Sequence, residues 1–423
     1  MTTGIPFVRT GSYPVREGNS VRLLVDGIPA FRRICDAIDA AEQSVCATVT
    51  FMWPSFEMPD GRGATLDVLD RAAARGVDVR VIFWRPGDDM VALRRNAFWG
   101  SPEHVAQLEA RRSGINVRWD RAARGFCQHQ KSWLIDAGTD SETAFVGGIN
   151  LNPHSLAVPG HAGDGQNHDV FLELRGPSVV DVHHNFVERW NEASERGAAG
   201  GMWGAASESD LPHPTRVPPP RGGTIAQVQR DRTNFDQYCA AIDAARRSIY
   251  IENQYIDVAA IIDRLGVALE RGVEVVAVVP AEPDGGSTLA MCAPLFNHEN
   301  FTLAGIAGLG ATGERSPVYV HDKLMLVDDE WATVGSCNLH RHSLFGNSEM
   351  NVAFRDPDAV RAMRVELFAE HLSRDTSTMD DRSALRLFGT IARENEKRRD
   401  FRDHAWQGLA FSLAGTSPPL LDG

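Results

Sequence analysis

The chain carries one short residue pattern at two widely separated places. Residues 129–136 read HQKSWLID and residues 321–328 read HDKLMLVD, so both spell H-x-K-x-x-x-x-D. Each copy is followed by a short apolar run and a Gly-small-x-Asn turn, at residues 147–150 and 335–338. A single pattern of this length arises easily by chance, whereas two copies with the same following turn indicate a duplicated half-site.

The repeat extends beyond these motifs. The sequence AIDAA at 37–41 recurs at 241–245, and RGVDV at 75–79 recurs as RGVEV at 271–275. The offsets are 204 and 196 residues for these pairs and 192 for the two motifs, which indicates a tandem duplication with loops of different length. Strand-like and helix-like stretches alternate through residues 21–84, a pattern typical of an α/β fold.

The two copies are separated by residues 197–223, which are dense in Gly and Pro and include a Pro-Pro-Pro run at 218–220. Such a segment sustains neither a helix nor a strand, so we predict an extended linker. The predicted first lobe covers residues 1–196, with an irregular lead-in at 1–20. The predicted second lobe covers 224–423 and ends in helices near 358–372 and 380–402.

Composition narrows the class of protein. The hydrophobic fraction of 43% and the charged fraction of 23% are typical of a soluble globular chain. A net charge of −13 argues against a protein that coats nucleic acid, because phosphate binding uses a basic surface. The six cysteines include no C-x-x-C pair, so we expect buried thiols.

The expected localisation follows from what the sequence lacks. Residues 1–6 show neither a basic nor an apolar signal region, and no apolar run approaches the length of a spanning helix. We expect a cytoplasmic protein or one peripheral to a membrane, with secretion open if a signal peptide had been removed.

The residue types in the motif suit phosphate chemistry. In a strand, His129 and Lys131 project from the same face, because side chains alternate with period two. Lysine and asparagine donate to phosphate oxygens, while histidine attacks or protonates. The six side chains expected around one phosphorus are His129, Lys131, Asn150, His321, Lys323 and Asn338.

Other polar residues have less certain roles. Each histidine needs a carboxylate on its second nitrogen, and the candidates are Asp169 and Glu349, both just before strand-like runs; the alternative is that they are ordinary strand-edge acids. The motif residues Asp136 and Asp328 either contact substrate or hold a turn. The small residues Gly148 and Ser336 are expected to let the backbone approach a ligand.

The doubled motif with its following turns resembles the phospholipase D superfamily, and bacterial phospholipase D enzymes in particular. Residues 251–255 (IENQY) resemble a strand end common in the second half of that family, which adds Glu252 and Gln254 to the expected substrate-binding residues. The resemblance spans about residues 21–372. It implies two α/β lobes, each a mixed sheet flanked by helices, related by a pseudo-twofold with one active site at their junction.

The resemblance also implies a reaction that uses no metal and no cofactor. One histidine forms a covalent phosphohistidine, and the other protonates the leaving alcohol and then activates water or an acceptor alcohol. By analogy with the bacterial lipases of the family, His129 is the expected nucleophile and His321 the expected acid and base. No metal is expected from His340-x-His342 either, because no carboxylate cluster accompanies it in the sequence.

The expected substrate is a glycerophospholipid such as phosphatidylcholine, hydrolysed to phosphatidic acid and a free headgroup alcohol, with transphosphatidylation as a second outcome. The alternatives are a phosphatidyltransferase like the cardiolipin and phosphatidylserine synthases, or a nucleic-acid phosphodiesterase. Apolar stretches for lipid contact occur at 51–54, with Trp53, and at 289–296, which alternatively forms a helix packed on its own lobe. The expected partner is a phospholipid surface touched peripherally by a monomer, not nucleic acid.

Overall fold

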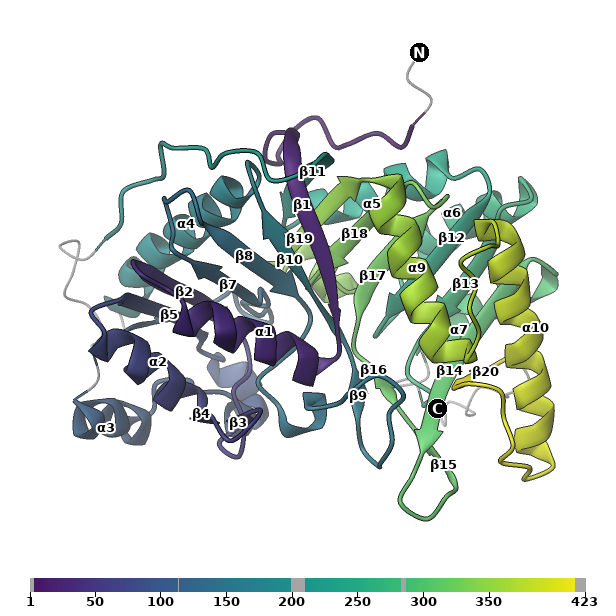
Figure 1. Cartoon of the computed structure of the whole chain (residues 1–423), viewed down its shortest axis with the longest axis horizontal. Helices are drawn as coiled ribbons and strands as arrows, with labels where there is room; N and C mark the ends of the chain where they lie inside the picture. Colours follow the sequence, from purple (N-terminus) through teal and green to yellow (C-terminus); the bar gives the residue numbers. More distant parts are fainter. Residues whose placement is uncertain (1–3, 113, 199–209, 283–286, 415–423) are drawn as a thin grey trace.

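The computed structural model describes residues 4–112, 114–198, 210–282 and 287–414. Its main feature is a 16-stranded sheet that runs through both halves of the molecule (Figure 1). In spatial order, the strands of the first lobe are β1 (Arg16–Val25), β10 (Val170–Arg175), β8 (Thr143–Gly147), β7 (Ser132–Ile135), β2 (Ser44–Val49), β5 (Asp78–Trp84) and β6 (Asn116–Asp120). Those of the second lobe are β11 (Thr224–Arg230), β19 (Met350–Arg355), β18 (Trp331–Gly335), β17 (Lys323–Val327), β12 (Ser248–Asn253), β13 (Glu274–Val278) and β14 (Phe301–Leu309), with β15 (Arg315–Pro317) and β20 (Ala410–Ser412) at the far edge.

The two lobes have the same strand order and the same strand directions. In each, four consecutive pairings are antiparallel and the last two are parallel, from β2 to β5 to β6 and from β12 to β13 to β14. The lobes join where β1 pairs antiparallel with β11, Arg16 opposite Ala226 and Asn19 opposite Thr224. The predicted α/β fold with two tandem lobes is therefore confirmed, and the sheets of the lobes are continuous.

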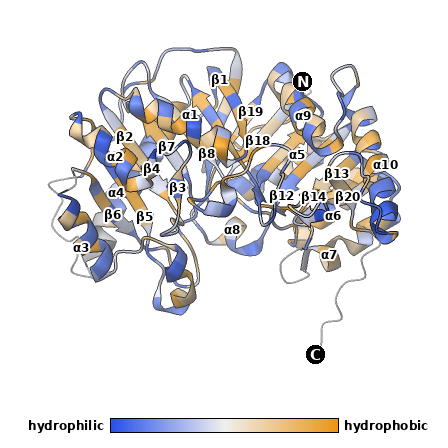
Figure 2. Cartoon of the chain, turned by 60° about the horizontal axis from the view of Figure 1, so that its bottom comes forward, coloured by the Kyte–Doolittle hydropathy of each residue, from blue (hydrophilic) through white to orange (hydrophobic). Residues whose placement is uncertain are grey.

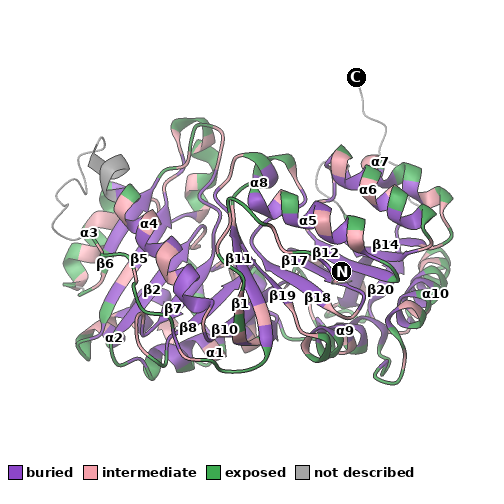
Figure 3. Ribbon diagram, turned by 90° about the horizontal axis from the view of Figure 1, so that it is seen from above, coloured by how far each residue is buried: buried purple, intermediate pink, exposed green. Residues whose placement is uncertain are grey.

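Equivalent helices cover equivalent faces. In the first lobe, one face of the sheet packs against α1 (Gly27–Asp39) and α2 (Thr65–Ala74), and the other against α4 (Val179–Ala198). In the second lobe, the corresponding helices are α5 (Thr233–Ala244) and α6 (Ala259–Glu270) on one face, with α9 (Pro357–Leu372) and α10 (Asp381–Asp400) on the other. Shorter helices are α3 (Pro102–Arg111), α7 (Ser287–Cys292) and α8 (Arg341–Phe345). Apolar residues line the strands of both lobes, and most strand residues are buried (Figures 2 and 3).

The helices form where apolar residues recur with helical spacing. In α1, Phe31, Ile34, Cys35 and Ile38 lie on one face and are fully buried against the sheet. The six cysteines are all buried and none forms a disulfide. Among the described helices, none combines the length and apolar character needed to cross a bilayer.

The structure moves several predicted boundaries. Strand β1 begins at Arg16, inside the predicted lead-in, because this segment pairs with both β10 and β11. Residues assigned to the first lobe also cross to the second, where Ile5 enters the apolar core and the Pro6 carbonyl accepts a hydrogen bond from Gln237. Helix α4 continues to Ala198, whereas residues 210–223 contain no helix or strand. Residues 199–209 of the predicted linker lie outside the described residues.

Candidate active site

Both motif histidines contact a carboxylate that belongs to the other lobe. Nδ1 of His129 lies 2.9 and 3.0 Å from the two carboxylate oxygens of Glu349. Nδ1 of His321 lies 2.6 Å from Oδ2 of Asp169. The structure thus brings together all four residues that the sequence singled out, and it pairs them crosswise between the lobes.

Backbone hydrogen bonds between the lobes create this crossing. The His129 amide donates to the carbonyl of Ser348, the residue before Glu349, at 3.0 Å. The His321 amide donates to the carbonyl of His168, the residue before Asp169, at 2.8 Å. On this second side, β16 (Tyr319–Val320) and β9 (Asn167–His168) pair as a short parallel ladder.

The sequence suggested that the histidines and lysines of the motifs lie in strands. Of these four residues, Lys323 alone does. His129 and Lys131 precede β7 in an irregular segment, and Lys323 is the first residue of β17. They still reach the same centre, because each lysine ammonium donates to the carbonyl of the histidine two residues before it. The hydrogen bond from each lysine to the carbonyl of its histidine, and not a shared strand, therefore holds the two residues together.

The environment keeps both histidines neutral in the substrate-free site. Burial lowers the pKa of His129, and burial together with Lys323 lowers the pKa of His321 to about 4. Burial would raise the pKa of Glu349, but its interaction with His129, followed by the charge of Lys131 and the hydrogen bond from Ser336, holds that pKa below its usual value. A neutral imidazole that donates from Nδ1 to a carboxylate has its Nε2 lone pair left for chemistry.

The two lysines are held by equivalent polar partners. Nζ of Lys131 donates to Oγ1 of Thr50 at 3.2 Å, and Nζ of Lys323 donates to Oε1 of Gln254 at 3.4 Å. Gln254 also accepts a hydrogen bond from the Asn338 amide at 3.3 Å, so it connects two members of the predicted phosphate site. Burial lowers the pKa of each lysine to about 8.

Asn150 is the last residue of the first Gly-small-x-Asn turn, as Asn338 is of the second. Its side-chain oxygen is buried and makes no hydrogen bond within the described chain, and the same holds for Asn338. Polar atoms buried without partners are costly, and they are common where a ligand completes the hydrogen bonding. An amide oxygen accepts hydrogen bonds, so these two atoms call for a donor, and the contact of each asparagine with phosphate through its Nδ2 group stays a prediction.

The small residues of the turns act on the carboxylates rather than on a ligand. A Cβ at Gly148 would lie 2.2 Å from Oδ1 of Asp169, so only glycine leaves room for that carboxylate. At the equivalent place, the Ser336 hydroxyl donates to Oε2 of Glu349 at 2.6 Å. Both residues therefore position a carboxylate, which corrects the expectation that they line the substrate.

The last residues of the two motifs are structural. Oδ1 of Asp136 accepts the backbone N–H groups of residues 42–44 at 2.7 to 3.3 Å. The Asp328 carboxylate accepts those of residues 246–248 at 2.8 to 2.9 Å. Both lie at the end of their strand away from the histidine, so the expected contact with substrate is replaced by the turn-holding role that the sequence left open.

Glu252 also lies elsewhere than expected. Its carboxylate is fully buried and contacts Nε2 of His168 and Nε2 of His371, each at 3.0 Å, and it accepts a hydrogen bond from Tyr250. These partners satisfy both oxygens and leave Glu252 in a buried polar network rather than at the substrate.

The two apolar stretches considered for lipid contact, 51–54 and 289–296, lie in different surroundings. Trp53 is half-buried beside the turn that follows Asn150, with its amide bonded to the Leu151 carbonyl at 2.9 Å. In 289–296, by contrast, Leu289, Cys292 and Leu295 enter the core of the second lobe. The second stretch is therefore a helix packed on its own lobe.

Sequence reasoning missed Thr50, although the repeat contained the means to find it. Thr50 and Gln254 are related by the same offset of 204 residues that relates the two AIDAA segments. Since Gln254 was selected on its own, applying this offset would have selected its counterpart.

Comparison with known proteins places this site in a family. Residues 34–190 and 238–371 match the family model described as "Cardiolipin synthase, PLD-like domain". A cardiolipin synthase A of Pseudomonas entomophila is 28% identical over 398 residues, covering 90% of this chain and 74% of its own length. A probable cardiolipin synthase of Bacillus subtilis is 26% identical, covering 84% of this chain and 67% of its own length.

Solved structures share the fold at low sequence identity. A phosphatidylserine synthase of Haemophilus influenzae superposes with a TM-score of 0.58 at 13% identity, covering 93% of this chain and 97% of the other. A polyphosphate kinase of Porphyromonas gingivalis gives a TM-score of 0.50 at 15% identity, covering 86% of this chain and 49% of the other.

Proposed function

Because the chain belongs to the family of the cardiolipin synthase, PLD-like domain, we propose that it is a phosphatidyltransferase that joins two glycerophospholipids into a cardiolipin-type product. The relatives at 26–28% identity are named cardiolipin synthases, not hydrolytic phospholipases. Their names favour the transferase alternative over hydrolysis to phosphatidic acid, the main expectation from the sequence. The transferase and the hydrolase readings both rest on membership of the phospholipase D superfamily and on a two-step transfer at a phosphodiester.

One observation carries the proposal: each motif histidine is oriented by a carboxylate from the opposite lobe. The two hydrogen bonds, His129 to Glu349 and His321 to Asp169, fix Nδ1 as the donor nitrogen of both rings. Both Nε2 atoms are then free to act in turn on one phosphorus. A covalent relay of this kind needs two such histidines, one as nucleophile and one as acid and base.

In the first step, Nε2 of His129 attacks the phosphorus of a bound phospholipid, and the bond from phosphorus to the headgroup oxygen breaks. His321 gives its Nε2 proton to the departing alkoxide, so the headgroup leaves as an alcohol. Lys131 and Lys323 face the non-bridging oxygens, whose negative charge increases as the attack proceeds. The phosphodiester anion also raises the pKa of His321 and so favours the protonated form that the step requires.

In the second step, the headgroup hydroxyl of another phospholipid attacks the phosphohistidine. His321, now neutral, accepts the proton of that hydroxyl, and the bond from phosphorus to Nε2 of His129 breaks. With phosphatidylglycerol in both positions, the products are cardiolipin and glycerol. Water in place of the second lipid would give phosphatidic acid.

The lipid substrate requires contact with a bilayer. We assign Trp53 to this contact, because it is a half-buried aromatic residue beside the Asn150 turn. The net charge of −13 disfavours a nucleic-acid substrate.

The proposal is tested by incubating the purified protein with vesicles of phosphatidylglycerol, and in parallel with vesicles of phosphatidylcholine. Mass spectrometry of the lipids and assay of the released alcohol distinguish the outcomes. We expect cardiolipin and glycerol in equal amounts, and loss of both in His129→Ala. Phosphatidic acid as the main product would replace transfer by hydrolysis, and cleavage of single-stranded DNA without lipid turnover would overturn the lipid assignment.

A further inference from the structure

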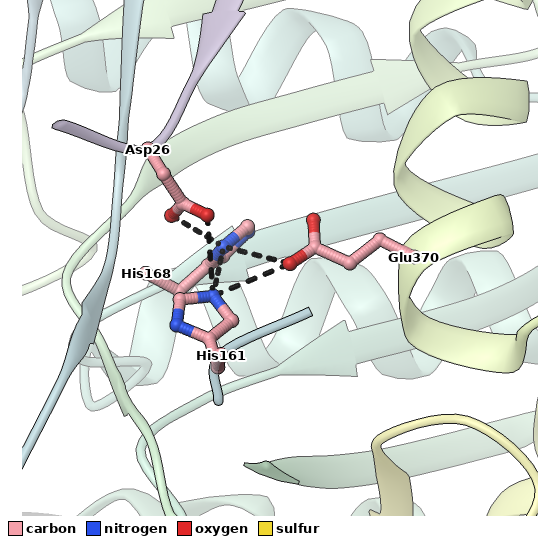
Figure 4. A group of neighbouring side chains, drawn as sticks. All are labelled: Asp26, His161, His168 and Glu370. Carbon is pink, nitrogen blue, oxygen red and sulfur yellow. Dashed lines mark hydrogen bonds and ion pairs between the residues drawn. The ribbon is translucent and has the colours of Figure 1, made fainter. Parts of the chain in front are cut away.

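A second group of functional side chains lies beside the active site and takes no part in the proposed reaction. Figure 4 shows Asp26, His161, His168 and Glu370 pointing toward one another. Three come from the first lobe and Glu370 comes from α9 of the second lobe. We propose that these four residues form a binding site for one divalent transition-metal ion, with the ligand set of Zn²⁺, which fastens the two lobes together behind the active site.

The spacing of the ligand atoms fits a tetrahedral ion. Metal bonds of about 2.0–2.2 Å to nitrogen and oxygen place the ligand atoms about 3.3–3.5 Å from one another. Nε2 of His161 lies 3.1 Å from Nδ1 of His168, 3.4 Å from Asp26 and 3.3 Å from Glu370. Nδ1 of His168 lies 3.1 Å from Asp26 and 4.0 Å from Glu370. All four ligand atoms lie within 4.8 Å of one another.

Nδ1 of His168 lies 3.1 Å from Oδ1 of Asp26, and the Gly160 amide donates to Oε1 of Glu370 at 3.0 Å, but hydrogen bonds do not satisfy the whole cluster. A proton between the two imidazole nitrogens, 3.1 Å apart, cannot also lie between His161 and either carboxylate. Oδ2 of Asp26 is fully buried and forms no hydrogen bond with any described residue. Burial of charged groups is costly without a partner, and a cation at the centre would be the partner of all four.

The backbone holds two of the ligands in conformations that non-glycine residues rarely adopt. Asp26 has φ of 65° and His161 has φ of 45°. A Cβ at position 308 would lie only 1.9 Å from the carbonyl oxygen of His161. The glycine at this position of β14 therefore allows the loop that carries His161 to pack against the second lobe. The backbone conformation at Asp26 and at His161 therefore directs both side chains toward the centre of the cluster.

The duplication supplies an internal comparison. Asp26 and Asp231 are equivalent: each has positive φ directly after one of the two strands that join the lobes, β1 or β11, and each donates its amide to the carbonyl of an orienting residue, Asp169 or Glu349. His168 corresponds to Ser348, since the carbonyl of each accepts the amide of a motif histidine. The fold therefore forms the same connection with serine, which leaves the imidazole of His168 unexplained by architecture.

The surroundings of His168 are those of a metal-bound histidine. Its second nitrogen, Nε2, lies 3.0 Å from Oε2 of Glu252. A carboxylate on the far nitrogen fixes the ring orientation and tautomer of metal-ligating histidines. Two nitrogen and two oxygen ligands favour Zn²⁺ over Ca²⁺ or Mg²⁺, which prefer six or more oxygens. The residue after His168 is Asp169, so the ion would also secure the carboxylate that orients His321.

The sequence predicted no metal, because no compact motif indicates one. Asp26 lies far in sequence from His161 and His168, although all three belong to the first lobe, and docking of the second lobe adds Glu370.

The test uses full-length protein without a histidine tag, expressed with added Zn²⁺ and measured by elemental mass spectrometry. We expect about one Zn²⁺ per chain, its removal by a strong chelator, and a lower melting temperature of the stripped protein that Zn²⁺ restores. Co²⁺ in its place should give the visible absorption of a tetrahedral site. These readouts need no lipid turnover, so they succeed or fail independently of the proposed function.

Matched variants locate the ion. His161→Gln and Asp26→Asn should weaken Zn²⁺ binding more than about tenfold. His183→Gln changes a half-buried histidine paired with a glutamate, Glu142 at 2.9 Å, and Asp231→Asn changes the counterpart of Asp26. Both controls should retain about one Zn²⁺. Metal-free protein that gains neither Zn²⁺ nor thermal stability on addition would overturn the proposal, as would equal Zn²⁺ binding by His161→Gln and His183→Gln.

Discussion

His129 and Glu349 are 220 positions apart in the chain, yet Nδ1 of His129 lies 2.9 Å from Oε1 of Glu349. The second pair, His321 and Asp169, is separated by 152 positions and meets at 2.6 Å. Each lobe thus supplies the histidine of one pair and the carboxylate of the other. Neither lobe alone contains an oriented histidine, so the catalytic unit is the docked pair of lobes.

Loss of either carboxylate charge should reduce turnover while leaving the fold intact. In Glu349→Gln the side chain keeps its size, but His129 loses the acceptor that fixes its tautomer. We expect kcat to fall by about 10²- to 10⁴-fold, the usual contribution of an oriented acid or base, and Asp169→Asn to behave similarly. The measurement is kcat and KM for lipid transfer, with KM changing little.

The matched control for this prediction is Glu142→Gln. Glu142 is also a buried carboxylate that faces a histidine, His183, but it lies in the loop before β8 and away from the motif histidines. Activity of this variant should stay near that of the natural protein. Equal losses in Glu142→Gln and Glu349→Gln would mean that the effect reports buried charge and not orientation.

Gly148→Ala should disable one half-site by steric displacement. The added methyl would lie 2.2 Å from Oδ1 of Asp169, so that carboxylate has to move away from His321. We expect a fall in kcat comparable to that of Asp169→Asn, and no further fall when the two substitutions are combined. Additive losses in the double variant would show that Gly148 acts on something other than Asp169.

The profile of kcat/KM against pH should be broad, and on the alkaline side it should fall at a lower pH than the ordinary lysine pKa would give. His129 must be neutral to attack phosphorus, and burial lowers its pKa, while the lysines Lys131 and Lys323 are charged below their pKa of about 8. Raising the pH through about 8 removes the ammonium charges that bind phosphate, so kcat/KM should fall there. It should also fall on the acid side, below the ordinary histidine pKa of about 6.5, as the nucleophile His129 becomes protonated. An alkaline limb near the ordinary lysine pKa of about 10.4 would contradict the effect of burial.

Trapping the covalent intermediate assigns the two histidine roles. A phosphodiester lipid with a nitrophenol leaving group needs no acid, so His321→Ala should still release one equivalent of nitrophenol and accumulate a phosphohistidine. His129→Ala should give neither. The opposite trapping pattern would make His321 the nucleophile. Intact-protein mass spectrometry detects the added mass of the covalent intermediate.

The aspartates of the motifs should contribute to stability and not to catalysis. Asp136→Asn keeps a residue that tolerates its φ of 53° but removes the charge that accepts three backbone N–H groups. We expect the free energy of unfolding to fall by about 1–3 kcal/mol, with kcat per folded molecule unchanged. Denaturant unfolding measures the first quantity, and a large loss of kcat in fully folded protein would restore the substrate-contact hypothesis.

Much of this protein can be predicted from residue order. The repeat, the alternation of strand and helix and the six polar residues of the motifs were all found without coordinates, because local spacing determines them. The roles of Gly148 and Glu252 were not found. Each depends on which distant residue occupies the adjacent space, Asp169 in the first case and His168 and His371 in the second.

The presence of two half-sites, and the side chains that each contains, follow from the order of the residues. That order did not determine how they pair, since Asp169 is nearer in sequence to His129, and Glu349 nearer to His321, than to their actual partners. Tertiary structure decided the crosswise pairing, because β1 joins β11 and the backbone of each motif histidine bonds to the other lobe. The same docking adds Glu370 to Asp26, His161 and His168, which no local pattern connects.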